Sequence, residues 1–509
     1  MENGKIKDQI QHKWYDKRSI SDQVILSICQ DKDHNIWLGT ETGGVDYYNQ
    51  RSSLFKTIYP DLKSKFNLGQ QVKALLSDKY NNLWIGMKDG GLGKLNISNG
   101  YQKESLSNII PLLNRSHKVY ALEETGDELW IGCFSEGVYV YNLHSKTIKH
   151  YHKTKNPGSL QNNEVYCIYA DHKNRIWIGT NTDLYLFQRE SETFKKISSI
   201  SNIHIKAITE DSKGHIWLAT ANHGVIIYNA EKKTVKTLHY MPNNEASICY
   251  GALSDLFCDK QGNMWISSEN GGLCCYFTAT RKIKRITTKK GLPANIVYKI
   301  LDGGKNALWI STNNGLVCID TRNMKVLRTE YESTHLTEGS FITGSGVTGV
   351  DGTLYFGNAN GIIAFDPRLL PHENNSFRVV ITGISVFGQD ISETDTLHRV
   401  TKKSIPYSSC IQLKYNESTF NISFSAMDYE RENKGYYLYM LEGVDHKWIK
   451  SKNITEASYH GLAPSNYRFK IKYSPDGINW NGPLTEFEII VSPPYGTQSG
   501  PIYYIVSLF

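Results

Sequence analysis

The sequence lacks the short motifs that mark common catalytic centres. It contains no Gly-x-x-x-x-Gly-Lys phosphate loop, no His-Glu-x-x-His zinc motif and no Gly-x-Ser-x-Gly nucleophile elbow. Its nine cysteines include no Cys-x-x-Cys pair, and their odd number argues against a complete disulfide framework. We therefore predict no catalytic residues, no metal site and no cofactor.

Long apolar runs and clusters of basic residues are missing as well. Residues 1–20 contain no apolar signal-peptide core, and the apolar run at 501–509 is far shorter than the roughly 20 residues that cross a bilayer. The net charge of +7 is spread over 509 residues without a Lys/Arg run. Nucleic acid is therefore not an expected partner, and we expect a membrane connection only through missing flanking segments.

Aromatic residues and glycines are plentiful, whereas helical periodicity is rare, which favours an all-β protein. One phrase recurs eight times: an acidic turn, a strand with an aromatic residue, and a second strand that a glycine usually opens. The aromatic residues, 40 to 48 positions apart, are Trp37, Trp84, Trp130, Trp177, Trp217, Trp265, Trp309 and Tyr355. Short strands at this repeat length are typical of β-propeller blades.

Two further positions repeat together with the aromatic residue. Six residues before it an acid stands in six copies, including Asp171 and Asp259, whereas Gly303 and Gly349 replace the acid in the last two. Two residues after it the side chain is always small, as at Gly86. We interpret the acids as caps of tight turns, the tryptophans as core between blades and the small residues as points where blades approach closely. A catalytic pair of carboxylates on one propeller face is the alternative reading of the acids.

After Pro371 the sequence changes character. Residues 378–388 and 411–425 alternate like strands, and turn signals recur at short intervals as far as Asn481. This pattern predicts an immunoglobulin-like β-sandwich at residues 377–493. No Cys-Trp-Cys pattern is present, so an antibody-like domain in the strict sense is not expected.

The two parts together resemble a known family. Leu83-Trp-Ile-Gly86 and Ile176-Trp-Ile-Gly-Thr180 resemble the two-component-regulator propeller repeat. Tyr436-Tyr-Leu-Tyr439 and Tyr467 resemble the triple-tyrosine domain that follows such propellers. The combination is similar to the periplasmic sensor of hybrid two-component histidine kinases in Bacteroides-type bacteria. This resemblance implies a module that binds an oligosaccharide from a complex glycan and signals to a kinase absent from this chain.

Members of this family usually carry two seven-bladed propellers, whereas this chain has eight repeats. We therefore predict a blade-like remnant of a preceding propeller at 1–60, a seven-bladed β-propeller at 61–371, the sandwich at 377–493 and a truncated juxtamembrane tail at 494–509. Eight blades in one ring are the alternative. The resemblance also implies a periplasmic location, a homodimer in the full-length protein and no enzymatic activity in this chain. A polysaccharide lyase or glycosidase on a propeller scaffold, or a protein-interaction scaffold, are the alternative functions.

The loops after each Trp-Ile-Gly-Thr phrase are predicted to converge on the propeller face opposite the acidic turns. Polar side chains and an aromatic residue on converging loops suit a sugar, which offers hydroxyl groups and an apolar ring face. Longer connections between blades add basic residues to the same face. The candidate ligand-binding residues are Lys88, Arg115, His117, Phe134, Glu136, Asn181, His223, Glu269, Asn270, Asn313, Asn314, His335, Asn358 and Asn360. For each residue taken alone, an ordinary polar loop tip is the competing interpretation.

Overall fold

The computed structural model divides the chain into two units, residues 1–371 and 372–509. It describes residues 11–12, 19–31, 35–48, 54–59, 71–103, 117–330, 340–370, 377–391, 404–428, 435–475, 477 and 480–494. Apart from strands, these residues form short 3-10 helices at η2 (Thr288–Lys290), η3 (Ile405–Tyr407) and η4 (Tyr415–Glu417). No helix among them is long and apolar enough to cross a membrane. The chain is all-β, as predicted.

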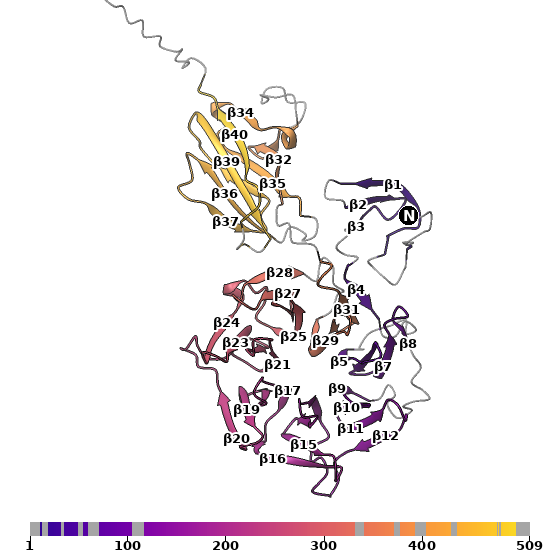
Figure 1. Cartoon of the computed structure of the whole chain (residues 1–509). Coiled ribbons are helices and arrows are strands. Elements are labelled where there is room, and N and C mark those ends of the chain that lie inside the picture. The colour runs from indigo at the N-terminus through magenta and orange to yellow at the C-terminus, as the bar shows by residue number, and fades with distance from the viewer. Residues whose placement is uncertain are drawn as a thin grey trace, which may run out of the picture. The chain divides into compact units, whose positions relative to one another are not determined.

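Seven four-stranded antiparallel sheets form a ring of blades in the first unit (Figure 1). The first strands of the blades are β5 (Val72–Ser77), β9 (Val119–Thr125), β13 (Val165–Ala170), β17 (Ile205–Glu210), β21 (Leu253–Cys258), β25 (Val297–Gly304) and β29 (Phe341–Thr348). The second strands are β6 (Asn82–Met87), β10 (Glu128–Cys133), β14 (Ile176–Thr180), β18 (Ile216–Thr220), β22 (Met264–Ser268), β26 (Ala307–Thr312) and β30 (Leu354–Asn358). The first strands of adjacent blades neighbour one another around the axis, and β29 neighbours β5.

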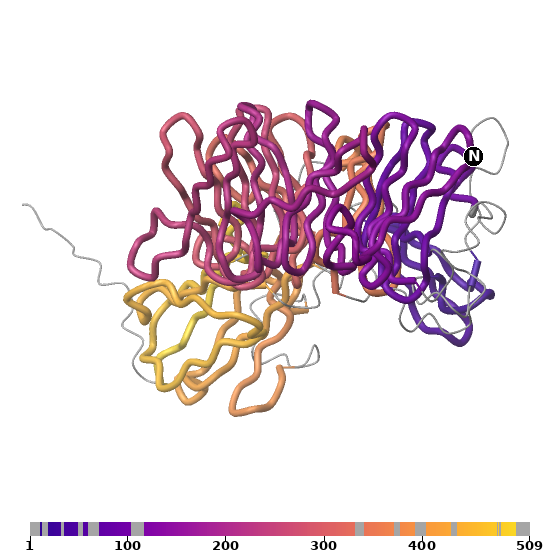
Figure 2. Tube along the Cα trace, turned by 90° about the horizontal axis from the view of Figure 1, so that it is seen from below, coloured from indigo at the N-terminus to yellow at the C-terminus, as the bar shows by residue number. Residues whose placement is uncertain are grey.

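The other two strands of each blade lie farther from the axis. The third strands are β7 (Gly91–Asn96), β11 (Gly137–Asn142), β15 (Asp183–Gln188), β19 (Val225–Asn229), β23 (Leu273–Phe277), β27 (Gly315–Asp320) and β31 (Ile362–Phe365). The outer strands are β8 (Gln102–Lys103), β12 (Ile148–Tyr151), β16 (Thr193–Ser201), β20 (Thr234–Leu238), β24 (Lys282–Ile286), β28 (Val326–Glu330) and β4 (Lys56–Ile58). In the edge view of Figure 2, the turns of the blades gather on two opposite faces of the ring.

One strand from the N-terminal side closes the ring. β4 precedes all other blade strands in the sequence, yet it pairs antiparallel with β31, with Ile58 opposite Ile362. The seventh blade is therefore built from both ends of the propeller sequence, and the predicted seven blades are confirmed. The pairing also places β4 in the propeller, although it lies within residues 1–60, which the sequence assigns to a preceding blade. β4 is three residues long and carries no repeat phrase, so nothing in the sequence signals this role.

The repeat of Trp37 stands apart from the ring. It forms a three-stranded sheet of β1 (Ile25–Gln30), β2 (Ile36–Thr40) and β3 (Val45–Tyr48), which pairs with no blade among the described residues. Ile28 is 71% exposed, whereas Leu75 at the equivalent place in the first blade is 7% exposed. This sheet therefore does not add an eighth blade, because β4 and β31 complete the ring without it.

In four blades the repeated acid caps its turn and also accepts a hydrogen bond from the tryptophan of the same blade. In the fifth blade, Asp259 Oδ1 accepts the N–H of Asn263 at 2.8 Å, and Oδ2 accepts the Nε1–H of Trp265 at 2.8 Å. The same indole bond joins Asp78 to Trp84, Asp171 to Trp177 and Asp211 to Trp217. In the sixth blade a glycine replaces the acid, because a Cβ at Gly303 would lie 2.6 Å from Cδ1 of Trp309. The structural interpretation of the acids is confirmed in these blades.

The repeated small residues mark close contacts between blades. A Cβ at Gly86 would lie 2.7 Å from Cγ1 of Val119 in the next blade. A Cβ at Gly357 in the last blade would lie 2.8 Å from Cγ1 of Val72 in the first, so this contact continues across the closure of the ring. Every repeated aromatic residue of the ring is at most 3% exposed, which confirms that these residues form the core between blades.

The second unit is a sandwich of two sheets. The first sheet contains β33 (Gln389–Asp390), β32 (Val379–Val386), β35 (Phe420–Ala426) and β38 (Glu456–Tyr459). The second contains β34 (Cys410–Leu413), β40 (Thr485–Val491), β39 (Ser465–Ser474), β36 (Tyr436–Glu442) and β37 (Ile449–Lys452). The tyrosines belong to its core: Tyr437 is fully buried and its hydroxyl accepts the N–H of Ala426 at 3.0 Å, while the Tyr473 hydroxyl donates to Asp428 at 2.8 Å.

Candidate functional site

The inner strands of the ring share a β-bulge near their first residue. In six blades the register with the second strand skips one position there. The skipped residues, which we call the bulge ring, are Lys73, Tyr120, Tyr166, Lys206, Ser254 and Tyr298. A bulge places its residue outside the strand register and turns the side chain away from the regular alternation. All of these side chains except Ser254 are partly exposed, although their sequence neighbours on the N-terminal side are buried.

Four aromatic side chains from the second, third and fourth blades contact one another. The ring of Tyr120 lies 5.2 Å from that of Phe134 and 5.9 Å from that of Tyr166, measured between centroids. Tyr166 in turn lies 4.2 Å from His204, which precedes β17. The ammonium group of Lys73 lies 5.4 Å from the Tyr120 centroid. We call Tyr120, Phe134, Tyr166 and His204 the aromatic cluster.

Burial shifts the pKa values of side chains in the aromatic cluster. It raises the pKa of Tyr120 and Tyr166 above the ordinary value, so both hydroxyls stay protonated at neutral pH and can donate hydrogen bonds. Burial and the charge of Lys206 lower the pKa of His204. Its Nε2 atom is buried and has no hydrogen-bond partner among the described residues. The cluster therefore offers apolar ring faces together with polar groups that can bond to a ligand.

Charged side chains surround the aromatic cluster. Lys206 forms an ion pair with Glu269, which lies on a loop of the fifth blade. Burial lowers the pKa of Lys73, the charges of Lys88 and Lys206 lower it further, and Asp89 and Glu269 oppose them. The Lys206–Glu269 ion pair thus joins the fourth blade to the fifth, and the groups that influence the pKa of Lys73 come from the first, fourth and fifth blades.

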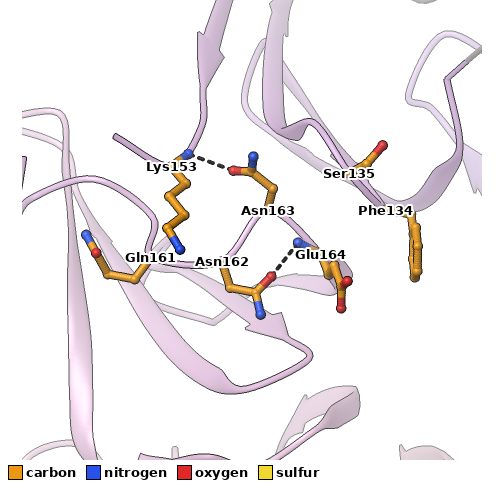
Figure 3. A pocket seen from close by; sticks show the side chains of 7 residues that line it. All are labelled: Phe134, Ser135, Lys153, Gln161, Asn162, Asn163 and Glu164. Carbon is orange, nitrogen blue, oxygen red and sulfur yellow. Dashed lines mark hydrogen bonds between the residues drawn. The ribbon is translucent and has the colours of Figure 1, made fainter. Parts of the chain in front are cut away.

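A pocket of about 330 Å³ adjoins the aromatic cluster between the second and third blades (Figure 3). Its lining residues are Phe134, Ser135, Lys153, Gln161, Asn162, Asn163 and Glu164. Asn163 Oδ1 accepts the backbone N–H of Lys153 at 2.6 Å, and Asn162 Oδ1 accepts that of Glu164 at 2.8 Å. The charge of Glu164 also raises the pKa of Tyr166, which links the pocket to the cluster.

The predicted loops share one face with the connections between blades. Backbone hydrogen bonds join Gly91 to His117 at 3.2 Å, Gly137 to Asn163 at 3.1 Å and Gly272 to Asn295 at 2.8 Å. In each pair the glycine opens or immediately precedes a third strand, and its partner precedes the inner strand of the next blade. The pocket combines both kinds of segment, since it takes Phe134 from a loop and Asn163 from a connection.

Three of the candidate residues lie at the aromatic cluster or its charged surroundings. Phe134 contacts Tyr120 and lines the pocket, Lys88 acts on Lys73, and Glu269 pairs with Lys206. Six others lie in the same kind of loop, between a second and a third strand: Glu136, Asn181, His223, Asn270, Asn313 and Asn314. Arg115 and His335 lie outside the described residues.

Two more candidates, Asn358 and His117, make contacts within their own blades, and Asn360 lies in the turn that Asn358 caps. Asn358 is fully buried, and its Oδ1 accepts the N–H groups of Asn360 at 2.9 Å and Gly361 at 2.7 Å, so it caps its own turn. The ring of His117 packs against Tyr139 in its own blade, with the centroids 6.2 Å apart. These contacts stabilise the blades, and we do not include Asn358, Asn360 and His117 in the proposed site.

Sequence reasoning missed most of the inner part of the site. The residues it did not select are the bulge-ring residues, together with His204, Lys153 and Gln161 to Glu164. One signal was available, because Lys73, Tyr120, Tyr166 and Lys206 each follow the first buried residue of an inner strand. A polar or aromatic side chain recurring at this place reads as ordinary strand alternation unless the bulge is known.

Family comparisons agree with this architecture. Residues 19–42, 159–182 and 199–222 match the two component regulator propeller, and residues 428–492 match the Y_Y_Y domain. The first two of these segments thus place the propeller match in the sheet of β1 to β3 and at the third blade, and the Y_Y_Y match lies in the sandwich. The third matched segment contains the Trp217 phrase of the fourth blade, and the Y_Y_Y match spans β36 to β40 of the sandwich.

Proteins similar to this chain include a histidine kinase and the extracellular domains of two-component systems. The histidine kinase P4 of Formosa agariphila is 24% identical over 496 residues, which cover 93% of this chain and 32% of the kinase. The extracellular domain of the hybrid two-component system BT3049 from B. thetaiotaomicron superposes with a TM-score of 0.77 at 24% identity, over 93% of this chain and 62% of that domain. The extracellular domain of BT4673 from the same organism gives 0.52 at 22% identity, over 96% and 66%. This chain thus spans about a third of the kinase, and the structural likeness establishes the fold.

Proposed function

We propose that this two-component regulator propeller is the ligand-binding part of an extracytoplasmic sensor and that it binds an oligosaccharide at the aromatic cluster. The observation that carries the proposal is the contact of Tyr120, Phe134 and Tyr166 beside a polar pocket. Aromatic faces pack against the apolar faces of sugar rings, while amides, carboxylates and ammonium groups bond to hydroxyls. The rigid ring holds these groups in place before the ligand arrives, which lowers the entropic cost of binding.

A binding role is favoured over glycan cleavage because the repeated carboxylates are already engaged in structural hydrogen bonds. Glycoside hydrolysis requires two carboxyl groups on opposite sides of the scissile bond. The repeated acids Asp78, Asp171, Asp211 and Asp259 instead bind the turn and the tryptophan of their own blades. They lie at the turns between first and second strands, on the face opposite the pocket. No group of His, Cys, Asp and Glu that could hold a metal occurs among the described residues.

The partners and the location follow from the same proposal. Two of the similar proteins are extracellular domains and one is a histidine kinase. We therefore propose that this chain lies in the periplasm. The sandwich at residues 377–493 would pass ligand binding on to a kinase beyond this chain and support a homodimer in the full-length protein.

Replacing Tyr166 by alanine should weaken oligosaccharide binding by about tenfold to a hundredfold, because it removes one aromatic face and the neighbour of both Tyr120 and His204. Isothermal titration of the full chain with a panel of neutral and acidic glycan digests would measure this loss. The matched control is Tyr80→Ala, which removes a 58% exposed tyrosine at an acidic turn on the opposite face. Equal affinity of the Tyr166→Ala variant and the unmodified chain would contradict the site, and no binding by any digest would contradict the proposed function.

A further inference from the structure

Lys73 is a partly buried lysine without a counter-charge in contact. It belongs to the bulge ring of the first blade, and its ammonium group lies 5.4 Å from the ring centroid of Tyr120. No carboxylate among the described residues comes within ion-pair distance of it; the ion pair of this region joins Lys206 to Glu269 instead. A partly desolvated ammonium group is costly unless an anion or several hydrogen-bond acceptors compensate it.

Charged side chains of both signs lie around Lys73. Burial is the largest cause of its lowered pKa; the charges of Lys88 and Lys206 lower the pKa further, and those of Asp89 and Glu269 oppose them. Because no carboxylate of the described residues is in contact with this ammonium group, an incoming group with a negative charge gains more there than a neutral hydroxyl does. The position also lies at the edge of the aromatic cluster, so a ring substituent can reach the ammonium group while the ring itself packs on Tyr120.

We propose that Lys73 receives the carboxylate or sulfate group of an acidic oligosaccharide whose sugar ring lies against the aromatic cluster. This inference rests on the proposed function and names the ligand class for the same site. A carboxylate and a sulfate share the chemistry that matters here, which is several acceptor oxygens carrying a full negative charge. Lys88 and Lys206 would add long-range attraction that weakens as the salt concentration rises.

The test is isothermal titration of the full chain with two matched pairs of probes. One pair is an oligogalacturonide mixture and its carboxyl-reduced form, and the other is a sulfated galactan digest and its desulfated form. Whichever acidic probe binds should do so at least tenfold more tightly than its neutral counterpart. Lys73→Gln should weaken the acidic probe by about tenfold to a hundredfold and leave the neutral probe unchanged, because charge-assisted hydrogen bonds are the ones removed.

Two control variants separate charge at this site from other effects. Lys73→Arg keeps the positive charge and should retain most of the preference for the acidic probe. Lys260→Gln removes an exposed lysine that pairs with Asp302 at the acidic turns and should change nothing. If the Lys73→Gln protein melts well below the others, Lys88→Gln replaces it in the comparison, with a smaller expected loss.

The outcomes distinguish this inference from the proposal beneath it. Binding of the neutral probes with equal or higher affinity than the acidic ones, unchanged in Lys73→Gln, would overturn the role of Lys73 and leave oligosaccharide binding intact. Binding of no probe at all would overturn both. A preference for the acidic probe that survives in Lys73→Gln would likewise refute the assignment to Lys73.

Discussion

Removal of residues 1–59 is expected to destabilise the propeller more than any single substitution in it. The deleted segment contains β4, which supplies the outer strand of the seventh blade and pairs with β31. It also contains Phe55 and Ile58, which are 3% and 7% exposed, and the Phe55 ring lies 4.8 Å from that of Phe365. Each buried side chain of this kind contributes about 1.5–3 kcal/mol, and the uncovered edge of β31 would be free to pair with other chains.

The matched control for this truncation is removal of residues 1–48 alone. These residues include β1, β2 and β3, which pair with no blade among the described residues, so their loss should leave the melting temperature of the ring nearly unchanged. Near-ultraviolet circular dichroism during heating follows the buried tryptophans of the blades directly. We expect the chain without residues 1–59 to unfold at a temperature lower by about 10 °C or more, or to aggregate. The same melting temperature for both truncations would show that β4 does not close the ring.

Replacing Glu123 by glutamine is expected to stabilise the propeller above neutral pH. Glu123 lies in β9 near the ring axis, and its carboxylate accepts the N–H of Ala170 in the next blade at 3.1 Å. Burial raises the pKa of Glu123 to about 7, although the Ala170 N–H and the charge of Lys299 oppose this effect. The folded protein therefore holds a proton there that the unfolded chain, with a carboxyl pKa near 4.5, releases.

The sign of the pH dependence follows from that difference. Between about pH 4.5 and 7 the folded state binds more protons at Glu123 than the unfolded state, so its contribution to stability falls as the pH rises, by on the order of 3 kcal/mol in total. Below this window both states are protonated and the contribution is constant. In urea denaturation of the full chain at pH 8, the free energy of unfolding of Glu123→Gln should exceed that of the unmodified protein by about 2–3 kcal/mol. At pH 4.5 the two proteins should have similar free energies of unfolding.

The control for this measurement is Glu136→Gln, a substitution in a loop between a second and a third strand. It should track the unmodified protein at every pH, because no buried carboxyl group is removed. Parallel stability curves for Glu123→Gln and the unmodified protein between pH 4.5 and 8 would contradict a raised pKa at Glu123. If Glu123→Gln were instead less stable than the unmodified protein at pH 8, the attraction between Lys299 and the ionised Glu123 carboxylate would outweigh the cost of burying that charge.

The blades can be predicted from the sequence because most of them repeat the same local pattern of acid, turn and tryptophan. The acid, turn and tryptophan lie within seven residues of one another, so the hydrogen bond from Trp265 to Asp259 is local and leaves a readable pattern. The closure by β4 leaves no such pattern, because its pairing with β31 depends on residues about 300 positions away. β4 is an outer strand of only three residues, and many short segments with strand-forming side chains could occupy that position.

The candidate site shows a similar division. The face and the loops follow from the order of strands in a blade, so Phe134, Lys88 and Glu269 could be selected from their places in the repeat. Tyr120 and Tyr166 could not, because a bulge at the start of each inner strand turns them away from the alternation that a regular strand would give. Asn358 shows the opposite error, since a polar residue at a loop turned out to be a buried turn cap.

The central claim is that an oligosaccharide binds at the ring axis against the aromatic cluster. Hydrogen exchange of the backbone amides in the full chain, measured with and without a saturating glycan digest, tests its location most directly. The account predicts slower exchange at the starts of the inner strands near Tyr120 and Tyr166 and in the pocket segment from Gln161 to Glu164, with no change at the acidic turns such as Asp211 to Gly214. Protection confined to the acidic turns, or to the sandwich, would contradict it.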